Sequence, residues 1–261
     1  MMNRKNVENV LKHKMLVNHS DGYVSSIEEN LIPGISKDMF FNELNNGKGK
    51  ELESKFLSIA SSAALAVNNF ALIRKYKEHF IFEHMTNFTE AGFEKEFSTD
   101  LRGIKPQLDF YLENENTVIG FESKFLEYFQ ETTVTFSESY NNLAYLDKIW
   151  FELIEKYNGK KMTLDVAQLM KHAFGIINQS LKLNKKGILV FIYWLPLNYK
   201  DIETCRALLE QIDELSCNFK KQKQIEFKTI SYLDFWDTYR NDLYLGKHVQ
   251  NMISRYGEIC V

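Results

Sequence analysis

The sequence predicts an α/β domain in which a central mixed β-sheet is flanked by helices. Residues 187–195 read GILVFIYWL, and a continuous apolar run of this length is typical of a strand buried on both faces. Residues 106–125 have the alternating pattern of a β-hairpin, and helical patterns precede and follow both segments. The order helix, strands, helix, buried strand, helix, strand indicates helices packed on a sheet of four to six strands.

The elements can be assigned in order from the spacing of apolar residues. A helix is predicted over residues 50–76, where apolar side chains recur every three or four positions. This stripe consists of Leu52, Phe56, Ile59, Ala63, Val67 and Phe70. Strands are expected at 79–83, 93–97, 107–112, 117–125, 187–195 and 225–232. Further helices are expected at 163–183 and 201–216, with two short ones around Gly246.

Length and composition are those of one globular domain. We expect a single domain over residues 1–261, with 1–49 as an N-terminal lead-in and 127–163 as a peripheral insertion. Hydrophobic residues make up 44% and charged residues 26%, which excludes a disordered chain. The net charge of −3 excludes a general basic coat for nucleic acid but allows a local basic groove.

The sequence also predicts where the protein resides. Its three cysteines are an odd number without a CxxC pair, so we expect free thiols in a reducing compartment. The first 14 residues lack the apolar segment of a signal peptide. The longest strongly apolar run, 187–197, is too short to span a bilayer as a helix. A cytoplasmic protein without a membrane partner is therefore predicted.

The hairpin PQLDFYLENENTVIGFESKF brings charged side chains onto one face of the expected sheet. In its second strand Glu122 and Lys124 share a face, because side chains two residues apart point the same way. The opposite face of that strand carries Ile119, Phe121, Ser123 and Phe125. In the first strand the same alternation separates Asp109 from an apolar face. That face consists of Leu108, Phe110 and Leu112.

Asp109 and Glu122 are expected to lie opposite each other and to share a metal ion. If Glu115 and Asn116 form a two-residue turn, the residue numbers of each cross-strand pair add up to 231, which pairs Asp109 with Glu122. Carboxylates about 5 Å apart repel each other unless a positive charge lies between them. Mg²⁺ is the expected ion, with Mn²⁺ as the alternative, because carboxylate oxygens are its usual ligands. A metal with Lys124 beside it suits phosphodiester hydrolysis, in which both stabilise charge on the phosphate.

The ExK tripeptide alone is a weak signal, since it occurs three times. The copies begin at Glu53, Glu122 and Glu226. Only the middle copy follows a strand that has an aspartate at hairpin distance. The alternative is a solvent-facing strand whose glutamate and lysine form a surface salt bridge.

Three segments in this order resemble a known group of nucleases. The aspartate of QLDF and the ESK tripeptide resemble the PD-(D/E)xK signature, with the proline displaced to Pro106. Together with SSAALAVN (61–68) upstream and QLMKH (168–172) downstream, ESKF resembles an uncharacterised bacterial family of predicted restriction endonucleases. The resemblance runs from about residue 22 to the C-terminus. It implies a restriction-endonuclease-like fold.

The resemblance implies roles for individual residues. Asp109 and Glu122 would be metal ligands, and Lys124 would be the catalytic lysine. The further implied residues are Gln168 in catalysis and Glu51 or Glu53 as a helix acid near the metal. Contacts with DNA are expected from Lys171, His172, Lys185 and Lys186. The alternative for residues 168–172 is a solvated helix face, and for Glu51 and Glu53 a favourable position in the first turn of a helix.

The predicted function is that of a Mg²⁺-dependent endonuclease acting on DNA in bacterial restriction or defence. DNA is the expected partner, and a homodimer is left open. One alternative is a non-catalytic nucleic-acid-binding or scaffold protein on the same fold. The other is an unrelated α/β interaction module whose hairpin face is simply solvated. A measurement of metal binding would separate both from the nuclease.

Overall fold

The computed structural model describes residues 4–15, 22–46, 52, 55–102 and 105–261, and its centre is a five-stranded sheet. The strand order is β1-β2-β3-β6-β7. The strands are β1 (Glu90–Glu96), β2 (Gln107–Glu113), β3 (Thr117–Lys124), β6 (Lys186–Tyr193) and β7 (Glu226–Ser231). The first three pair antiparallel, whereas β3, β6 and β7 are parallel. The predicted mixed sheet is confirmed.

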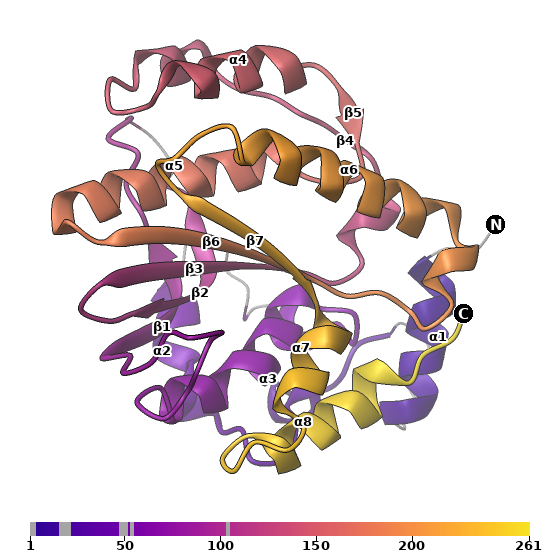
Figure 1. The fold of residues 1–261 in the computed structure, drawn as a ribbon. Helices are drawn as coiled ribbons and strands as arrows, with labels where there is room; N and C mark the ends of the chain where they lie inside the picture. The colour runs from indigo at the N-terminus through magenta and orange to yellow at the C-terminus, as the bar shows by residue number, and fades with distance from the viewer. Residues whose placement is uncertain (1–3, 16–21, 47–51, 53–54, 103–104) are drawn as a thin grey trace.

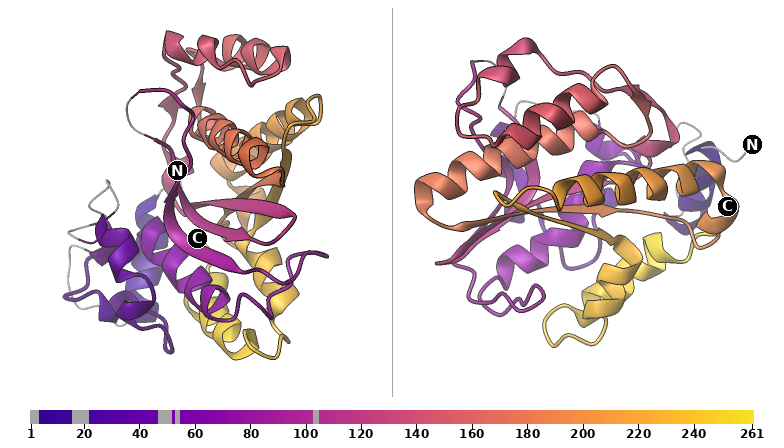
Figure 2. Two further views of the ribbon diagram at one scale, coloured as in Figure 1. Left: turned by 90° about the vertical axis from the view of Figure 1, so that its left-hand side faces the viewer. Right: turned by 45° about the horizontal axis from the view of Figure 1, so that its top comes forward.

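Helices cover both faces of this sheet, as Figures 1 and 2 show. On one face lie α1 (Arg4–Met15), α2 (Phe41–Asn46), α3 (Ser62–Lys75), α7 (Tyr232–Tyr239) and α8 (Gly246–Met252). On the other lie α5 (Val166–Leu183) and α6 (Glu203–Phe219), with α4 (Lys148–Tyr157) outside them. This α/β arrangement is consistent with a restriction-endonuclease-like fold. Within the described ranges, no helix combines the length and the apolar character needed to cross a bilayer.

Two hydrophobic clusters, one on each face of the sheet, hold the layers together. On the α3 face Phe70 stacks on Phe110 of β2, with ring centroids 4.6 Å apart, and packs against Phe121 of β3. On the α5 face Val118 of β3 joins the second cluster. β6 is buried from Gly187 to Tyr193, as the apolar run predicted for a central strand. Burial of this apolar surface on both faces is the main stabilising contribution to the fold.

The helix predicted over residues 50–76 is shorter than expected. α3 begins at Ser62, after a single 3₁₀ turn at Lys55–Leu57. The Ser61 side chain accepts a hydrogen bond from the backbone N–H of Ala64, which is the contact of an N-cap residue. The apolar spacing upstream of Ser61 therefore belongs to packed turns rather than to helix.

The strand predicted over residues 79–83 is wrong. This segment forms a tight turn in which Phe82 and Met85 make an isolated bridge. Glu83 inside the turn has a φ of 55°, and this left-handed backbone cannot continue a strand. The aromatic residues that indicated a strand are instead core residues: Phe80 and Phe82 are both buried against the α3 face.

The N-terminal lead-in and the 127–163 segment both contribute to the core. Val7 and Phe40 of the lead-in are buried in the α3-face cluster. The 127–163 segment contains the short pair β4 (Thr132–Thr133) and β5 (Lys161–Met162) in addition to α4. Trp150 of α4 packs edge-on against Phe174 of α5, with centroids 5.3 Å apart. The segment therefore forms an outer layer that covers α5 (Figure 2).

Candidate active site

The β2–β3 hairpin has the register that the sequence predicted. Phe110 pairs with Phe121, and the backbone N–H of Asn114 donates to the carbonyl of Thr117 across a two-residue turn. The paired residues end at Phe110 and Phe121, and Asp109 and Glu122 are the next residues of the two strands. The hairpin therefore places both carboxylates at the same level of the sheet.

The alternation of β2 changes at Asp109. Leu108 was expected beside Phe110 but packs on the α5 face, where its Cδ1 fills the space that a Cβ on Gly120 would need. The β1–β2 pairing passes from Phe93–Phe110 to Lys95–Leu108, and Glu94 between them has a φ of 50°. This irregularity brings an additional carboxylate, from Glu94, to the cavity that Asp109 lines.

Asp109 is held in place by the neighbouring strand. Its Oδ2 accepts a 2.7 Å hydrogen bond from the backbone N–H of Ser123. Removal of the carboxyl group from water raises the pKa of Asp109 well above its usual value, and the negative charge of Glu122 raises it further. Lys124 and the Ser123 N–H offset part of this shift. A group whose ionised form is disfavoured in this way would gain from a bound cation.

Glu122 is fully buried between two basic side chains. Its side chain is 1% exposed, Lys124 Nζ lies 2.6 Å from Oε1, and His172 Nε2 lies 3.0 Å from Oε2. Burial opposes ionisation, but Lys124 and His172 together outweigh it and lower the pKa of Glu122 to about 2. Within the described residues, neither oxygen has a partner at hydrogen-bonding angles. Glu122 is thus a buried carboxylate whose ionised form Lys124 and His172 stabilise.

A cavity of about 640 Å³ opens beside these residues, and we call it the carboxylate cavity. Among the residues that line it are Asp109, Lys124, Gln168, Lys171, His172 and Glu94. Five of them were predicted site residues, so the structure brings together side chains from β2, β3 and α5. Gln168, which the sequence predicted to point into the same cavity as Glu122, lines this cavity, whereas Glu122 is not among its lining residues. The sequence offered a solvated helix face as the alternative for His172, and its side chain is instead 2% exposed.

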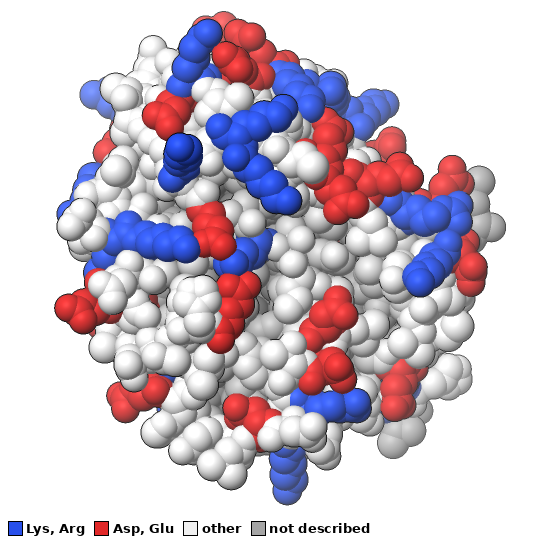
Figure 3. Space-filling view, in the orientation of Figure 1, with Lys and Arg blue, Asp and Glu red and all other residues white. Residues whose placement is uncertain are grey.

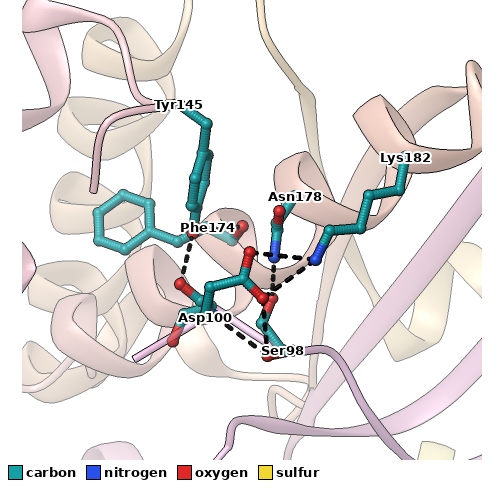
Figure 4. Close-up of polar contacts among 7 residues, drawn as sticks. Ser98, Asp100, Tyr145, Phe174, Asn178 and Lys182 are labelled. Carbon is teal, nitrogen blue, oxygen red and sulfur yellow. Dashed lines mark hydrogen bonds and ion pairs between the residues drawn. The ribbon is translucent and has the colours of Figure 1, made fainter. Parts of the chain in front are cut away.

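α5 is fixed against the β1–β2 connection, which sets the position of Gln168 and His172. The Asp165 side chain caps the helix by accepting from the Gln168 N–H. Gly175 allows α5 to lie close to the backbone at Phe97, since a Cβ at position 175 would lie 2.6 Å from the Phe97 carbonyl oxygen. Figure 4 shows the adjoining contacts, in which Asn178 donates to the Ser98 carbonyl and Lys182 pairs with Asp100.

Some predicted residues are not brought to this cavity. Lys185 pairs with Glu113 at 2.6 Å, and Lys186 forms an ion pair with Glu226. Both lie at the other end of the sheet, because Lys186 is the partner of Thr117 where β3 begins. Glu51 and Glu53 lie outside the described residues.

Two features of the site were not predicted from the sequence. No sequence pattern indicated Glu94 as a site residue, because its position depends on a local irregularity in β1. The contact of His172 with Glu122 joins residues 50 positions apart and depends on how α5 packs on β3. The QLMKH segment could have suggested it, since His172 lies four residues after Gln168 and therefore on the same side of the helix.

The donor set of the carboxylate cavity fits a hard divalent cation. Asp109 and Glu94 line this cavity with carboxylate oxygens, which Mg²⁺ prefers, and no cysteine is among its lining residues. The buried Glu122 lies behind Lys124 and His172, which line the cavity. Lys124 and His172 each contact one oxygen of Glu122. Among the residues described, which exclude 47–51 and 53–54, no three His, Cys, Asp or Glu side chains already form a closed metal site.

The charge on the surface is mixed. On the face seen in Figure 3, acidic and basic side chains are interspersed, in agreement with the net charge of −3. The basic side chains are densest in the upper half of this view, where the helices of the α5 face lie. Any contact with nucleic acid would therefore be local rather than spread over the whole face.

Comparison with known proteins gives one match. A family model described as "Restriction Endonuclease associating with ARP" matches residues 4–257. Neither the curated proteins nor the solved structures gave a match to this chain. The matched region covers the hairpin, α5 and every other described helix and strand.

Proposed function

This chain belongs to the family of restriction endonucleases associating with ARP, and from this premise we propose that it is a metal-dependent DNA endonuclease of the PD-(D/E)xK type. One observation carries the proposal. The buried, ionised Glu122 contacts Lys124 and His172, and these two residues line an open cavity together with Asp109. Restriction or defence in a bacterial cell is the proposed setting, with DNA as the substrate and ARP as an associated partner.

Asp109 and Glu122 would hold the metal ion, for which we propose Mg²⁺ with Mn²⁺ as the alternative. Glu94 is a further carboxylate that lines the cavity with Asp109, and Glu51 or Glu53 remains a prediction. When bound, the ion would polarise the scissile phosphate as a Lewis acid. The raised pKa of Asp109 supports this assignment, because a cation would relieve the repulsion that now disfavours its ionised form.

Lys124 would stabilise negative charge on the phosphate. Burial disfavours its ammonium form, but the negative charges of Glu122 and Glu127 outweigh this and raise the pKa of Lys124 above its usual value. It is therefore a cation at neutral pH and cannot accept a proton from an attacking water. Its side chain is 20% exposed, so the ammonium group can reach a phosphate in the cavity.

α5 would supply the remaining polar contacts. Gln168 lines the cavity and could hydrogen-bond a phosphate oxygen or the attacking water. His172 is buried against Glu122, and we propose that it positions this carboxylate rather than contacting DNA. Lys171 lies at the cavity with its ammonium 5.6 Å from the Phe136 ring centroid, and it is the proposed contact to the DNA backbone.

The test is a cleavage assay with plasmid, linear duplex and single-stranded DNA, each with Mg²⁺, with Mn²⁺ and with EDTA. The wild-type protein should cleave only with metal, and Asp109→Asn should lose at least about 100-fold in rate. Asp237→Asn is the matched control, because Asp237 is an exposed carboxylate paired only with Arg240 at the surface among the described contacts. Full activity of Asp109→Asn would show the assignment to be wrong.

A second function is a non-catalytic nucleic-acid-binding protein on the same fold. The observation that favours it is the contact of Glu122 with both Lys124 and His172, which places a basic side chain at each of its oxygens. Calorimetric titration with Mg²⁺ and Mn²⁺ separates the two functions. A protein that binds DNA but shows no metal binding that depends on Asp109 would be the non-catalytic one.

A further inference from the structure

A second cavity adjoins the carboxylate cavity on the far side of Lys124, and we call it the aromatic cavity. Its volume is about 570 Å³, within the range of about 300–1,000 Å³ that is typical of small-molecule sites. Three residues line both cavities: Lys124, Asp165 and Gln168. One ligand could therefore place a group in the aromatic cavity while a phosphate bonded to that group lies at Lys124.

The wall of the aromatic cavity is suited to a flat apolar group with polar edges. Phe129 is partly exposed and stacks on the buried Tyr128, with ring centroids 4.8 Å apart and an angle of 27° between the rings. Leu208 and Phe191, both buried, complete the apolar part of the wall. Polar side chains lie on the same wall: Gln130, Thr132, Thr163 and Gln168.

We propose that the aromatic cavity binds one nucleobase of the DNA, unstacked from its neighbours, next to the scissile phosphate. The inference rests on the proposed nuclease function, because it takes the phosphate at Lys124 as its reference point. A nucleobase has a flat apolar surface that stacks on aromatic side chains, and its edge carries hydrogen-bond donors and acceptors. Phe129 supplies the stacking surface, and the amide groups of Gln130 and Gln168 supply polar contacts to the base edge.

The proposal defines a substrate class. Removing a base from a paired duplex costs stacking and pairing energy, whereas a base in a single strand or a mismatch has already lost most of it. The protein therefore favours DNA with unpaired nucleotides at the cleavage position. The net charge of −3 agrees with a short contact at one or two nucleotides rather than a long duplex footprint.

The experiment measures binding, so it does not depend on cleavage. Fluorescence anisotropy with Asp109→Asn protein compares a short single-stranded DNA with versions in which an abasic site is moved along the strand. One abasic position should weaken binding about 5- to 100-fold, which is the effect expected from loss of one stacked base. Phe129→Ala in the same background should weaken binding to the intact strand by a similar factor. The strand with the critical abasic site should bind equally well whether Phe129 is present or replaced.

Tyr244→Ala is the matched control, since Tyr244 is a partly exposed aromatic residue that stacks on His79 away from both cavities. It should leave the abasic scan unchanged. Thr132→Trp, which narrows the mouth of the cavity from an exposed position, should reproduce the effect of Phe129→Ala without removing a core contact.

The outcomes separate this inference from the proposed function. If the wild-type protein cleaves DNA with metal but binds all the abasic strands with the same affinity, the nucleobase site is wrong and the nuclease function is supported. Discrimination that depends on Phe129 in a protein that cleaves no DNA would support the nucleobase site and overturn the nuclease. Faster cleavage of fully paired duplex than of mismatched duplex would also overturn the nucleobase site.

Discussion

Asp109 and Glu122 carry the same charged group, but they lie in opposite electrostatic environments. Burial and the neighbouring carboxylate raise the pKa of Asp109. Burial also acts on Glu122, but Lys124 and His172 reverse its effect and lower that pKa to about 2. The two residues should therefore respond to neutral substitution in opposite directions, and stability measurements on metal-free protein can separate them.

Asp109→Asn should raise the stability of the metal-free protein. A pKa that is higher in the folded than in the unfolded state means that the folded state binds the proton more tightly, so the ionised group costs stability at neutral pH. The amide removes that cost and can still accept from the Ser123 N–H. Urea unfolding at pH 7 in EDTA should show a higher midpoint for Asp109→Asn than for the wild-type protein. A loss of stability would mean that the carboxylates do not repel each other.

Glu122→Gln should lower stability, because it leaves Lys124 and His172 facing an uncharged group in the interior. Removal of one partner from a buried ion pair costs about 3–5 kcal/mol. The folded-state pKa of Glu122 is lowered from 4.5 to about 2, so its contribution is present above about pH 4.5 and is lost as the pH falls toward 2. Urea midpoints of wild type and variant should therefore converge between pH 5 and about pH 2.5. Glu131→Gln, at an exposed position, serves as the control. The difference between its urea midpoint and that of the wild type should not change over this pH range.

At the scale of elements, α5 connects the site to the rest of the fold. Its N-terminal half carries Gln168 and His172, and its middle contacts the β1–β2 connection at Gly175. The contacts in Figure 4 extend this attachment to Asn178 and Lys182. Displacement of α5 from that connection would move both functional side chains relative to Glu122.

Gly175→Ala should lower both stability and activity. The new methyl group would lie 2.6 Å from the Phe97 carbonyl oxygen and 2.9 Å from the Phe97 Cβ, so helix and connection must separate. Overpacking of this kind costs about 1–3 kcal/mol. Thermal unfolding measures the loss of stability, and the cleavage assay measures the loss of activity. Lys182→Ala, which removes an exposed contact of the same helix, should leave both close to wild type; equal effects of the two variants would contradict the role of the close approach.

At the scale of the whole molecule, the two groups of predicted DNA-binding lysines lie far apart. Lys171 is at the carboxylate cavity, whereas Lys185 and Lys186 are at the opposite end of the sheet. Seven residues of β3 separate the level of Lys186 from that of Lys124, which is roughly 23 Å of strand. Both distant lysines already pair with carboxylates. A short DNA contact at the cavity would not reach them.

Lys171→Gln should therefore weaken DNA binding and reduce the slope of log affinity against log salt by about 1, as expected for loss of one phosphate contact. The double variant Lys185→Gln, Lys186→Gln should leave affinity and slope unchanged. Binding measured between low and moderate salt with Asp109→Asn protein distinguishes the two. The reverse result would mean that DNA follows the turn end of the β2–β3 hairpin.

The sequence alone determined the mixed α/β fold and the register of the hairpin. Strict alternation in β3 and a two-residue turn are local properties, and together they fix the pairing from Glu113–Val118 to Phe110–Phe121. The same alternation was less reliable in β2, where Leu108 turned to the other face beside the irregular Glu94. Helix periodicity located α3 but not its start, because the Ser61 cap prevailed over the apolar spacing upstream.

Only the tertiary structure decided the environment of the carboxylates. The contact between His172 and Glu122, the arrival of Glu94 beside Asp109, and the joining of two cavities at Lys124 all depend on packing between distant segments. Glu94 contributes to the raised pKa of Asp109, whereas His172 contributes to the lowered pKa of Glu122, and a motif cannot encode this difference. A motif specifies which groups are present, whereas burial and the distances between charges decide the state in which each group exists.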